Sequence, residues 1–182
     1  MSDNFDYLNG EVGEPTSYTP IPKAKFQAVV GVAEMVDPIA LGWKAPEDMA
    51  GQALDDYQRP FPRLRWKIEA TESGQETEYA GRMVDQRLDL RSGVNPRTGR
   101  SFAEGRADLL RAVNGLKARD EVTGLKLIDV NLAGLDRDEA ILAANQSLKK
   151  YEGTRAVVQV IHIKNKTSGE VRESVGKIVL EK

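Results

Sequence analysis

The sequence contains no cysteine and only one histidine, His162, among its 182 residues. The lack of cysteine excludes disulfide bonds, thiolate metal sites and cysteine nucleophiles. A single imidazole leaves almost no material for a histidine metal cluster or a Ser-His-Asp triad. We therefore expect no metal and no other cofactor, and a structural role for His162.

Long apolar runs are also missing. No apolar stretch approaches the roughly 18 residues that a membrane-spanning helix requires. The N-terminal stretch "MSDNFDYLNGEVGEPTSY" has neither the basic nor the apolar region of a secretory signal. With 40% hydrophobic and 30% charged residues, the composition is typical of globular proteins. We expect a cytoplasmic protein that has no membrane partner.

The net charge of -2 is unevenly distributed along the chain. Residues 1–22 hold Asp3, Asp6, Glu11 and Glu14 and no Lys or Arg, so the remainder is close to neutral. This first segment is rich in Gly, Pro, Ser and Thr and has no hydrophobic periodicity. The pattern predicts a flexible acidic leader over residues 1–22 and one domain over residues 23–182.

Hydrophobic alternation predicts five strands. The second is the clearest, because Leu64, Trp66 and Ile68 alternate with Arg63, Arg65 and Lys67. The same kind of pattern places the other strands at residues 23–37, 81–91, 157–164 and 171–180. In the last of these, Val171, Val175 and Val179 are expected on one face, and Ile178 and Leu180 on the other.

Two helices are predicted between the third and fourth strands. Ser101 with Glu104, and Asp136 with Glu139, have the spacing of capping boxes. The first helix is expected to end at Gly115 and the second, about 16 residues long, near Gly153. Residues 124–134, between them, fit either a short strand or an irregular packed segment. A further short helix is expected over Pro46–Leu54, within the proline-rich residues 38–62.

The resulting order, β-β-β-α-α-β-β, is that of the OB fold, a five-stranded Greek-key β-barrel with helices inserted after the third strand. In this order of elements the sequence resembles phage-encoded single-stranded DNA-binding proteins. The similar stretches are "FQAVVGVAEMV", "PRLRWKIEAT", "YAGRMVDQRLDL", "SFAEGRADLLRAVNGL" and "YEGTRAVVQVIHIKNKTSGEVRESVGKIV". The resemblance covers about residues 23–182. The extra helix and the 25-residue insertion at 38–62 depart from the minimal barrel, and the acidic C-terminal tail of bacterial single-strand binders is missing.

The resemblance implies a viral, non-catalytic protein that coats single-stranded DNA during bacteriophage DNA replication or recombination. It implies the host cytoplasm as location, and phage replication or recombination proteins as further partners; an oligomer is compatible with it.

A sequence-tolerant single-strand binder needs cations along the phosphates and flat side chains on which bases stack. In an OB fold, the face of strands two and three and the loops beside it bind oligonucleotides. The candidates on these segments are Trp43, Lys44, Tyr57, Arg59, Phe61, Arg63, Arg65, Lys67, Arg87, Arg91, Arg97, Arg100, Lys164 and Lys166. Trp43, Tyr57 and Phe61 are expected in the loop before the second strand, where they either stack on bases or anchor the loop.

Less specific interpretations fit some of the same residues. The charged face of the second strand is also typical of a solvated surface, on which Asp85 and Asp89 pair with Arg65 and Lys67. Trp66 belongs to the apolar face and is expected in the core.

Two other functions remain open. One is a protein-interaction or virion-assembly module in which the aromatic loop is a hydrophobic anchor. The other is a metal-dependent nuclease that uses the acidic residues between 69 and 89, although these alternate with Lys and Arg and follow no ligand spacing. There is no P-loop either, so we do not expect an enzyme.

Overall fold

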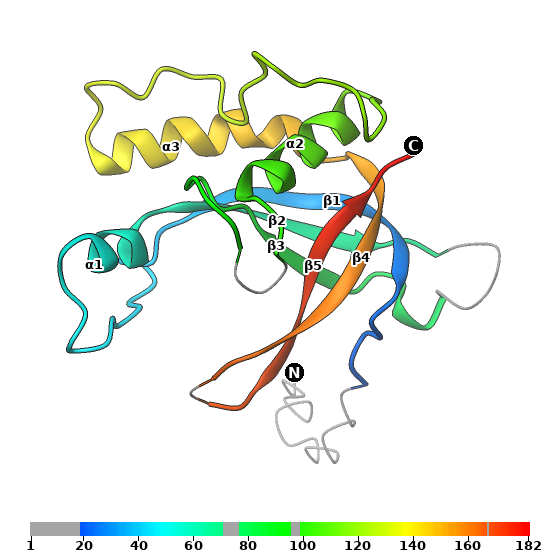
Figure 1. The fold of residues 1–182 in the computed structure, drawn as a ribbon, viewed down its shortest axis with the longest axis horizontal. Helices are drawn as coiled ribbons and strands as arrows, with labels where there is room; N and C mark the ends of the chain where they lie inside the picture. The colour runs from blue at the N-terminus through cyan, green and yellow to red at the C-terminus, as the bar shows by residue number, and fades with distance from the viewer. Residues whose placement is uncertain (1–18, 71–76, 96–98, 167) are drawn as a thin grey trace, which may run out of the picture.

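The computed structural model of the protein describes residues 19–70, 77–95, 99–166 and 168–182 (Figure 1). Within these residues, five strands close into one barrel in the order β1-β2-β3-β5-β4. The strands are β1 (Lys25–Val36), β2 (Phe61–Ile68), β3 (Met83–Arg87), β4 (Arg155–Lys164) and β5 (Val171–Val179). Neighbours pair antiparallel except β3 and β5, which are parallel. The five predicted strands are confirmed, and this closed mixed barrel is compatible with an OB-like barrel.

The barrel interior is filled by the apolar faces that the alternation predicted. Leu64, Trp66 and Ile68 of β2 are at most 1% exposed, so the core position of Trp66 is confirmed. The indole Nε1 of Trp66 donates a hydrogen bond to Oε1 of Gln86 on β3 at 2.8 Å. A buried polar group is tolerated when it has such a partner, which explains why a glutamine lies in this core.

A bulge in β5 changes which side chains face inward. Lys177 pairs with Gln159 and Val175 with Val160, so Gly176 is an extra residue between them. As a result Val175 and Ile178 both point into the core, although strict alternation puts them on opposite faces. The predicted separation of these two residues is therefore wrong.

The two helices between β3 and β4 are α2 (Phe102–Val113) and α3 (Arg137–Leu148). Ser101 caps α2 by accepting a hydrogen bond from the amide of Ala103, and Asp136 and Glu139 form the predicted capping box of α3. Helix α3 is shorter than expected, because its last turn tightens into a 3-10 helix, η3 (Lys149–Tyr151). Both helices lie along the same side of the barrel (Figure 1).

Strand β4 pairs with residues 25–29 of β1, and α3 and the residues after it cover the later part of the same edge. Oδ1 of Asn145 accepts a hydrogen bond from the backbone N–H of Met35, and Oε1 of Glu152 accepts one from Ala33. Residues 124–134, which precede the helix, contain no strand and are an irregular packed segment. Leu127 is buried there, and its carbonyl accepts a hydrogen bond from the hydroxyl of Tyr151.

Residues 37–60, which we call the excursion, leave the barrel between β1 and β2 and form the separate lobe beside it in Figure 1. Their helix, α1, spans Gly51–Gln58, so the expected helix over Pro46–Leu54 lies too early in the chain. Pro46 is instead part of a turn that Met49 closes through its backbone N–H. Arg137 of α3 holds both ends of the excursion, through the carboxylate of Asp37 and the carbonyl of Gln58.

The barrel begins earlier than the sequence indicated. Ile21, which we assigned to the leader, is 1% exposed and belongs to the core. Its N–H donates to Oε1 of Glu173, and its carbonyl lies 2.7 Å from Nε2 of His162. This contact gives His162 a structural partner; the predicted flexibility of residues 1–18 lies outside the described residues. None of the helices that the structure describes is long and apolar enough to span a membrane.

Candidate nucleic-acid interface

The charged face of β2 is largely paired with acids. Antiparallel register sets Arg63 opposite Glu34 and Arg65 opposite Asp85. The Arg63 guanidinium lies 2.6 Å from the carboxylate of Glu34, and that of Arg65 lies 3.1 Å from Asp85. The solvated-face interpretation is thus realised for Arg65 and Asp85, whereas Asp89 pairs with Arg91. Lys67 is exposed and has no acidic partner among the described residues.

The three loop aromatics form one cluster at the base of the excursion. Phe61 is the first residue of β2 rather than part of a loop, and it is 7% exposed. Its ring lies 5.9 Å from that of Trp43 and has the Arg87 guanidinium 3.9 Å above it. Tyr57 packs beside Trp43 and donates its hydroxyl hydrogen to the carbonyl of Lys44.

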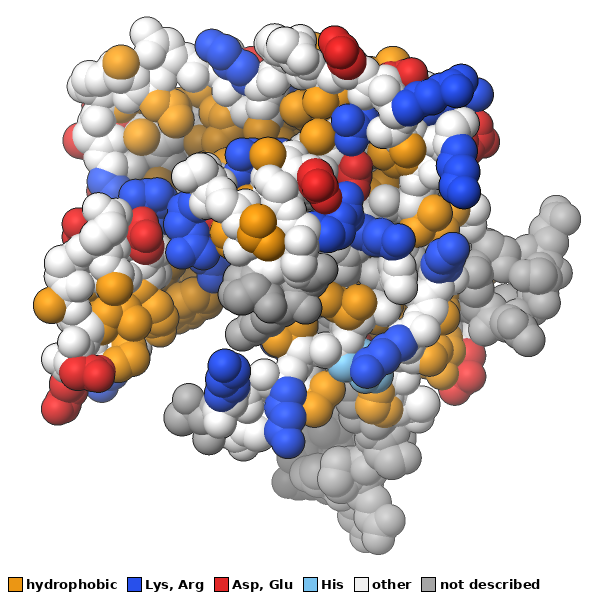
Figure 2. Space-filling model, viewed as in Figure 1, with side chains coloured by type: hydrophobic (Ala, Val, Ile, Leu, Met, Phe, Trp, Pro, Cys, Tyr) orange, Lys and Arg blue, Asp and Glu red, His pale blue; other side chains and the backbone are white. Residues whose placement is uncertain are grey.

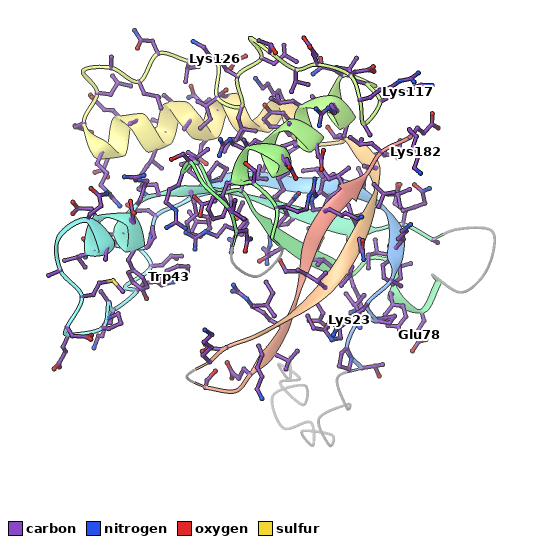
Figure 3. All side chains as sticks on the ribbon, viewed as in Figure 1. Lys23, Trp43, Glu78, Lys117, Lys126 and Lys182 are labelled. Atoms are coloured by element: carbon purple, nitrogen blue, oxygen red, sulfur yellow. The ribbon has the colours of Figure 1, made fainter. Side chains whose placement is uncertain are left out.

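This cluster favours loop anchoring for Phe61 and Tyr57. Phe61 is closed off as a stacking platform, because Trp43 and Arg87 cover it. Trp43 retains 41% exposure, and Figure 3 shows its side chain on the side of the excursion that faces the barrel. Of the three rings, Trp43 is therefore the one that a base can still reach in this conformation.

A concave surface lies between β3, the start of α2 and the hairpin of β4 and β5. Its first part is a concavity of about 370 Å³ with Ile161, Ile163, Val175 and Phe102 among its lining residues. The cations that line it are Arg87, Arg91, Arg100 and Arg172. A second concavity, which shares Arg100, Ile161, Ile163 and Gly176 with the first, adds Lys164, Lys166 and Lys177 from the hairpin. We call the two together the groove.

The groove is strongly basic. Among its described lining residues, seven are Lys or Arg and one, Asp89, is acidic. Figure 2 shows basic side chains across the middle of this face and along the hairpin below it. Ile161 and Ile163 of the hairpin line both concavities and form the apolar floor of the groove. A surface with this charge and an apolar floor is suited to a polyanion that also carries flat rings.

Some groove arginines are held in position by acids. Arg91 pairs with Asp89; although burial pushes the pKa of Asp89 upward, the hydrogen bonds from Arg91 outweigh it, and the pKa lies below its usual 3.8. Arg100 binds both Glu104 and the buried Asp108. Asp108 also binds Arg111, so its charge is shared. These contacts orient the guanidinium groups and leave the groove with a net positive charge.

The predicted residues are thus only partly brought together. Arg87, Arg91, Arg100, Lys164 and Lys166 meet in the groove. Arg59 lines a neighbouring concavity with Arg91 and Phe102 and pairs with Asp56. Lys44 is exposed on the excursion, and Arg97 lies outside the described residues.

Five residues that we place in the groove were not among the predicted candidates: Phe102, Ile161, Ile163, Arg172 and Lys177. Phe102 is the first residue of α2, and the Arg91 guanidinium lies 5.3 Å from the centroid of its ring. Arg172 and Lys177 belong to β5, "VRESVGKIV", of which only the apolar residues were assigned to faces from the sequence. The signal that could have found these two residues was the predicted hairpin of the last two strands. Its pairing places Arg172 beside Ile163.

Comparisons with known proteins give no family. No protein-family model matches the chain, and no curated protein matches it. Among the residues that the structure describes, no three Asp, Glu or His side chains gather as a metal site would require. The function therefore has to be argued from the groove itself.

Proposed function

We propose that this chain is a non-catalytic single-stranded DNA-binding protein with an OB-fold barrel, which coats DNA in phage replication or recombination. The barrel order supports this assignment, because helices follow the third strand and a hairpin closes the barrel. The observation that carries it is the groove, in which seven basic side chains surround an apolar floor. Phosphates bind the guanidinium and ammonium groups, and bases rest on Phe102, Ile161 and Ile163.

Because of the groove, we place the main DNA contact on the β4–β5 hairpin and not on the charged face of β2 by itself. Arg63 and Arg65 already bind Glu34 and Asp85, so a phosphate must compete with a carboxylate there. Lys164, Lys166 and Arg172 are exposed and have no acidic partner among the described residues. We therefore assign the dominant electrostatic contribution to the β4–β5 hairpin.

The test is a triple charge reversal, Lys164→Glu, Lys166→Glu and Arg172→Glu. Binding of oligo-dT is measured by fluorescence anisotropy at two salt concentrations. Each lost phosphate contact lowers the salt slope by about one, so affinity at low salt should fall by about a hundredfold or more. The matched control reverses Lys117, Lys126 and Lys182, which do not line the groove and which Figure 3 shows away from the tip of the hairpin. Equal affinity of the two variants, or no affinity of the parent protein at low salt, contradicts the proposal.

A second function, a protein-interaction or virion-assembly module, is favoured by the excursion. Ile39, Leu41 and Trp43 are 51%, 58% and 41% exposed there, and exposed apolar groups of this kind mark partner surfaces. Such binding depends little on salt and survives the hairpin charge reversal. A gel-shift panel of single-stranded DNA, RNA and duplex, beside a partner pull-down with the same variants, separates the two functions.

A further inference from the structure

A third concavity, of about 510 Å³, opens beside the groove between α1 and the start of α2. Its lining includes Gln52, Asp56, Arg59, Arg91, Val94 and Phe102. Arg91 and Phe102 also line the groove, so the two spaces meet at this pair. Its volume falls within the roughly 300–1,000 Å³ of small-molecule sites, and the proposed function does not use it. We call it the side pocket.

The polar groups of the side pocket have a definite arrangement. Oδ1 of Asp56 accepts a hydrogen bond from Nε2 of Gln52 at 3.1 Å and lies 3.1 Å from the Arg59 guanidinium. Oδ2 of Asp56 and the amide oxygen of Gln52 take no hydrogen bond from the described residues. The pocket thus offers two acceptor oxygens from neighbouring turns of α1, with the Phe102 ring and two guanidinium groups around them.

We propose that the side pocket binds a single guanine base of a strand lying in the groove. Guanine presents two adjacent donors, the N1–H and the N2 amino group, to two acceptors. Cytosine and adenine present one amino group beside an acceptor nitrogen, and thymine presents one N–H between two carbonyls. The Phe102 ring supplies a face for stacking, and Arg59 and Arg91 supply donors for the O6 oxygen or a phosphate. This inference rests on the proposed function and adds a base preference to it.

The experiment compares two oligonucleotides of equal length, one all thymidine and one with three central guanosines. Affinities are measured by anisotropy with the full-length protein at one salt concentration. We expect the guanosine-containing strand to bind about tenfold more tightly, because a bidentate contact to a base edge discriminates by that order. Asp56→Ala should reduce this ratio to about one while the thymidine strand still binds.

Asp55→Ala is the matched control, because Asp55 is exposed on the same helix and carries the same charge. It should leave the ratio unchanged, and Gln52→Ala should lower it in part. Circular dichroism checks that each variant is folded. Binding of the thymidine strand without a preference for guanosine overturns the side pocket alone. Absence of binding to either strand overturns the proposed function as well.

Discussion

At the scale of single residues, two buried hydrogen bonds hold polar groups inside the protein. One joins Trp66 to Gln86 within the barrel. The other joins the hydroxyl of Tyr151 to the carbonyl of Leu127, beneath α3. In each case a large ring is completely buried, and its polar atom has one partner. Removing that partner leaves a desolvated donor, which is the costly outcome.

The variant Gln86→Leu tests the first of these bonds. It keeps a side chain of similar size but leaves the Trp66 N–H without an acceptor. The free energy of unfolding should fall by about 1–3 kcal/mol, measured by denaturant titration followed through tryptophan fluorescence and circular dichroism. The double variant Trp66→Phe with Gln86→Leu should show less than the sum of the two single losses. If the two single losses add up to that of the double variant, the hydrogen bond between Trp66 and Gln86 does not contribute to stability.

The phenol of Tyr151 predicts a dependence of stability on alkaline pH. Burial raises its pKa to about 12, and the Asp129 charge adds to the shift. A raised acid pKa means that the folded state favours the neutral phenol. Its contribution is complete below pH 10, the pKa in the unfolded chain, and is lost as the pH rises toward 12.

Stability should therefore decline by about 2–3 kcal/mol over that interval from this group alone. The variant Tyr151→Phe should be less stable at neutral pH, since it lacks the hydrogen bond, and should show a shallower decline. Parallel stability curves for the two proteins between pH 10 and 12 contradict the assignment. The measurement is urea denaturation at stepped pH.

At the scale of elements, sequence patterns predicted the strands better than the irregular positions within them. The two-residue alternation of β2 identified Leu64 and Trp66 as core because every residue there follows the pleat. The same rule failed in β5, because the extra residue at Gly176 interrupts the alternation. Relative to the residues after it, those before it therefore face the opposite side from the one that a continuous pattern predicts. Phe61 was expected in the loop before β2, whereas it begins that strand and is buried by Trp43 from the distant excursion and by Arg87 from β3. Alternation within one strand does not reveal which side chains from distant segments will bury a residue.

The bulge at Gly176 gives a prediction for β5. A Cβ atom added there would lie 2.7 Å from Cγ2 of Ile161 on the paired strand. Gly176→Ala should therefore lower the free energy of unfolding by about 1–3 kcal/mol, through overpacking. Thermal and urea denaturation measure the loss. The additional change Ile161→Ala should restore part of it, because it removes the atom that clashes.

Gly105→Ala provides the opposite outcome as a control. Gly105 lies in α2, where an added Cβ meets nothing within 4 Å. Alanine is the better helix former, so this variant should gain about 0.5–1 kcal/mol. A gain at both positions shows that the bulge tolerates a side chain and that the described contact is not restrictive.

At the scale of the whole molecule, the N-terminal boundary of the barrel determines how much of the acidic leader can be removed without loss of a core residue. Ile21 is part of the core, so a chain that starts at Lys23 lacks a buried side chain, whereas one that starts at Thr19 keeps it. The shorter chain should be less stable by about 2–5 kcal/mol. Denaturation of both chains measures this difference, and equal stabilities contradict the core role of Ile21.

The same pair of chains bears on DNA binding. A chain that starts at Thr19 lacks all four acids of the leader and keeps every described residue of the barrel, so its affinity for oligo-dT tests the effect of their charge. The sequence predicted an interface of cations from distant segments, and the groove gathers five of those residues. The pairing of Arg65 with Asp85 was one interpretation of the charged face of β2. The pairing of Arg63 with Glu34 was not predicted, because register is set only when the barrel closes.

Arg137 contacts Asp37 and Gln58, which lie at the two ends of the excursion. Because one guanidinium holds both ends of the excursion, the chain leaves and re-enters the barrel at the same place. A short turn in place of residues 39–57 would keep the pairing of Val36 with Phe61 but would remove Trp43, which covers Phe61. Loss of the excursion would remove Trp43 and the exposed Ile39 and Leu41 while leaving the lining residues of the groove in the chain.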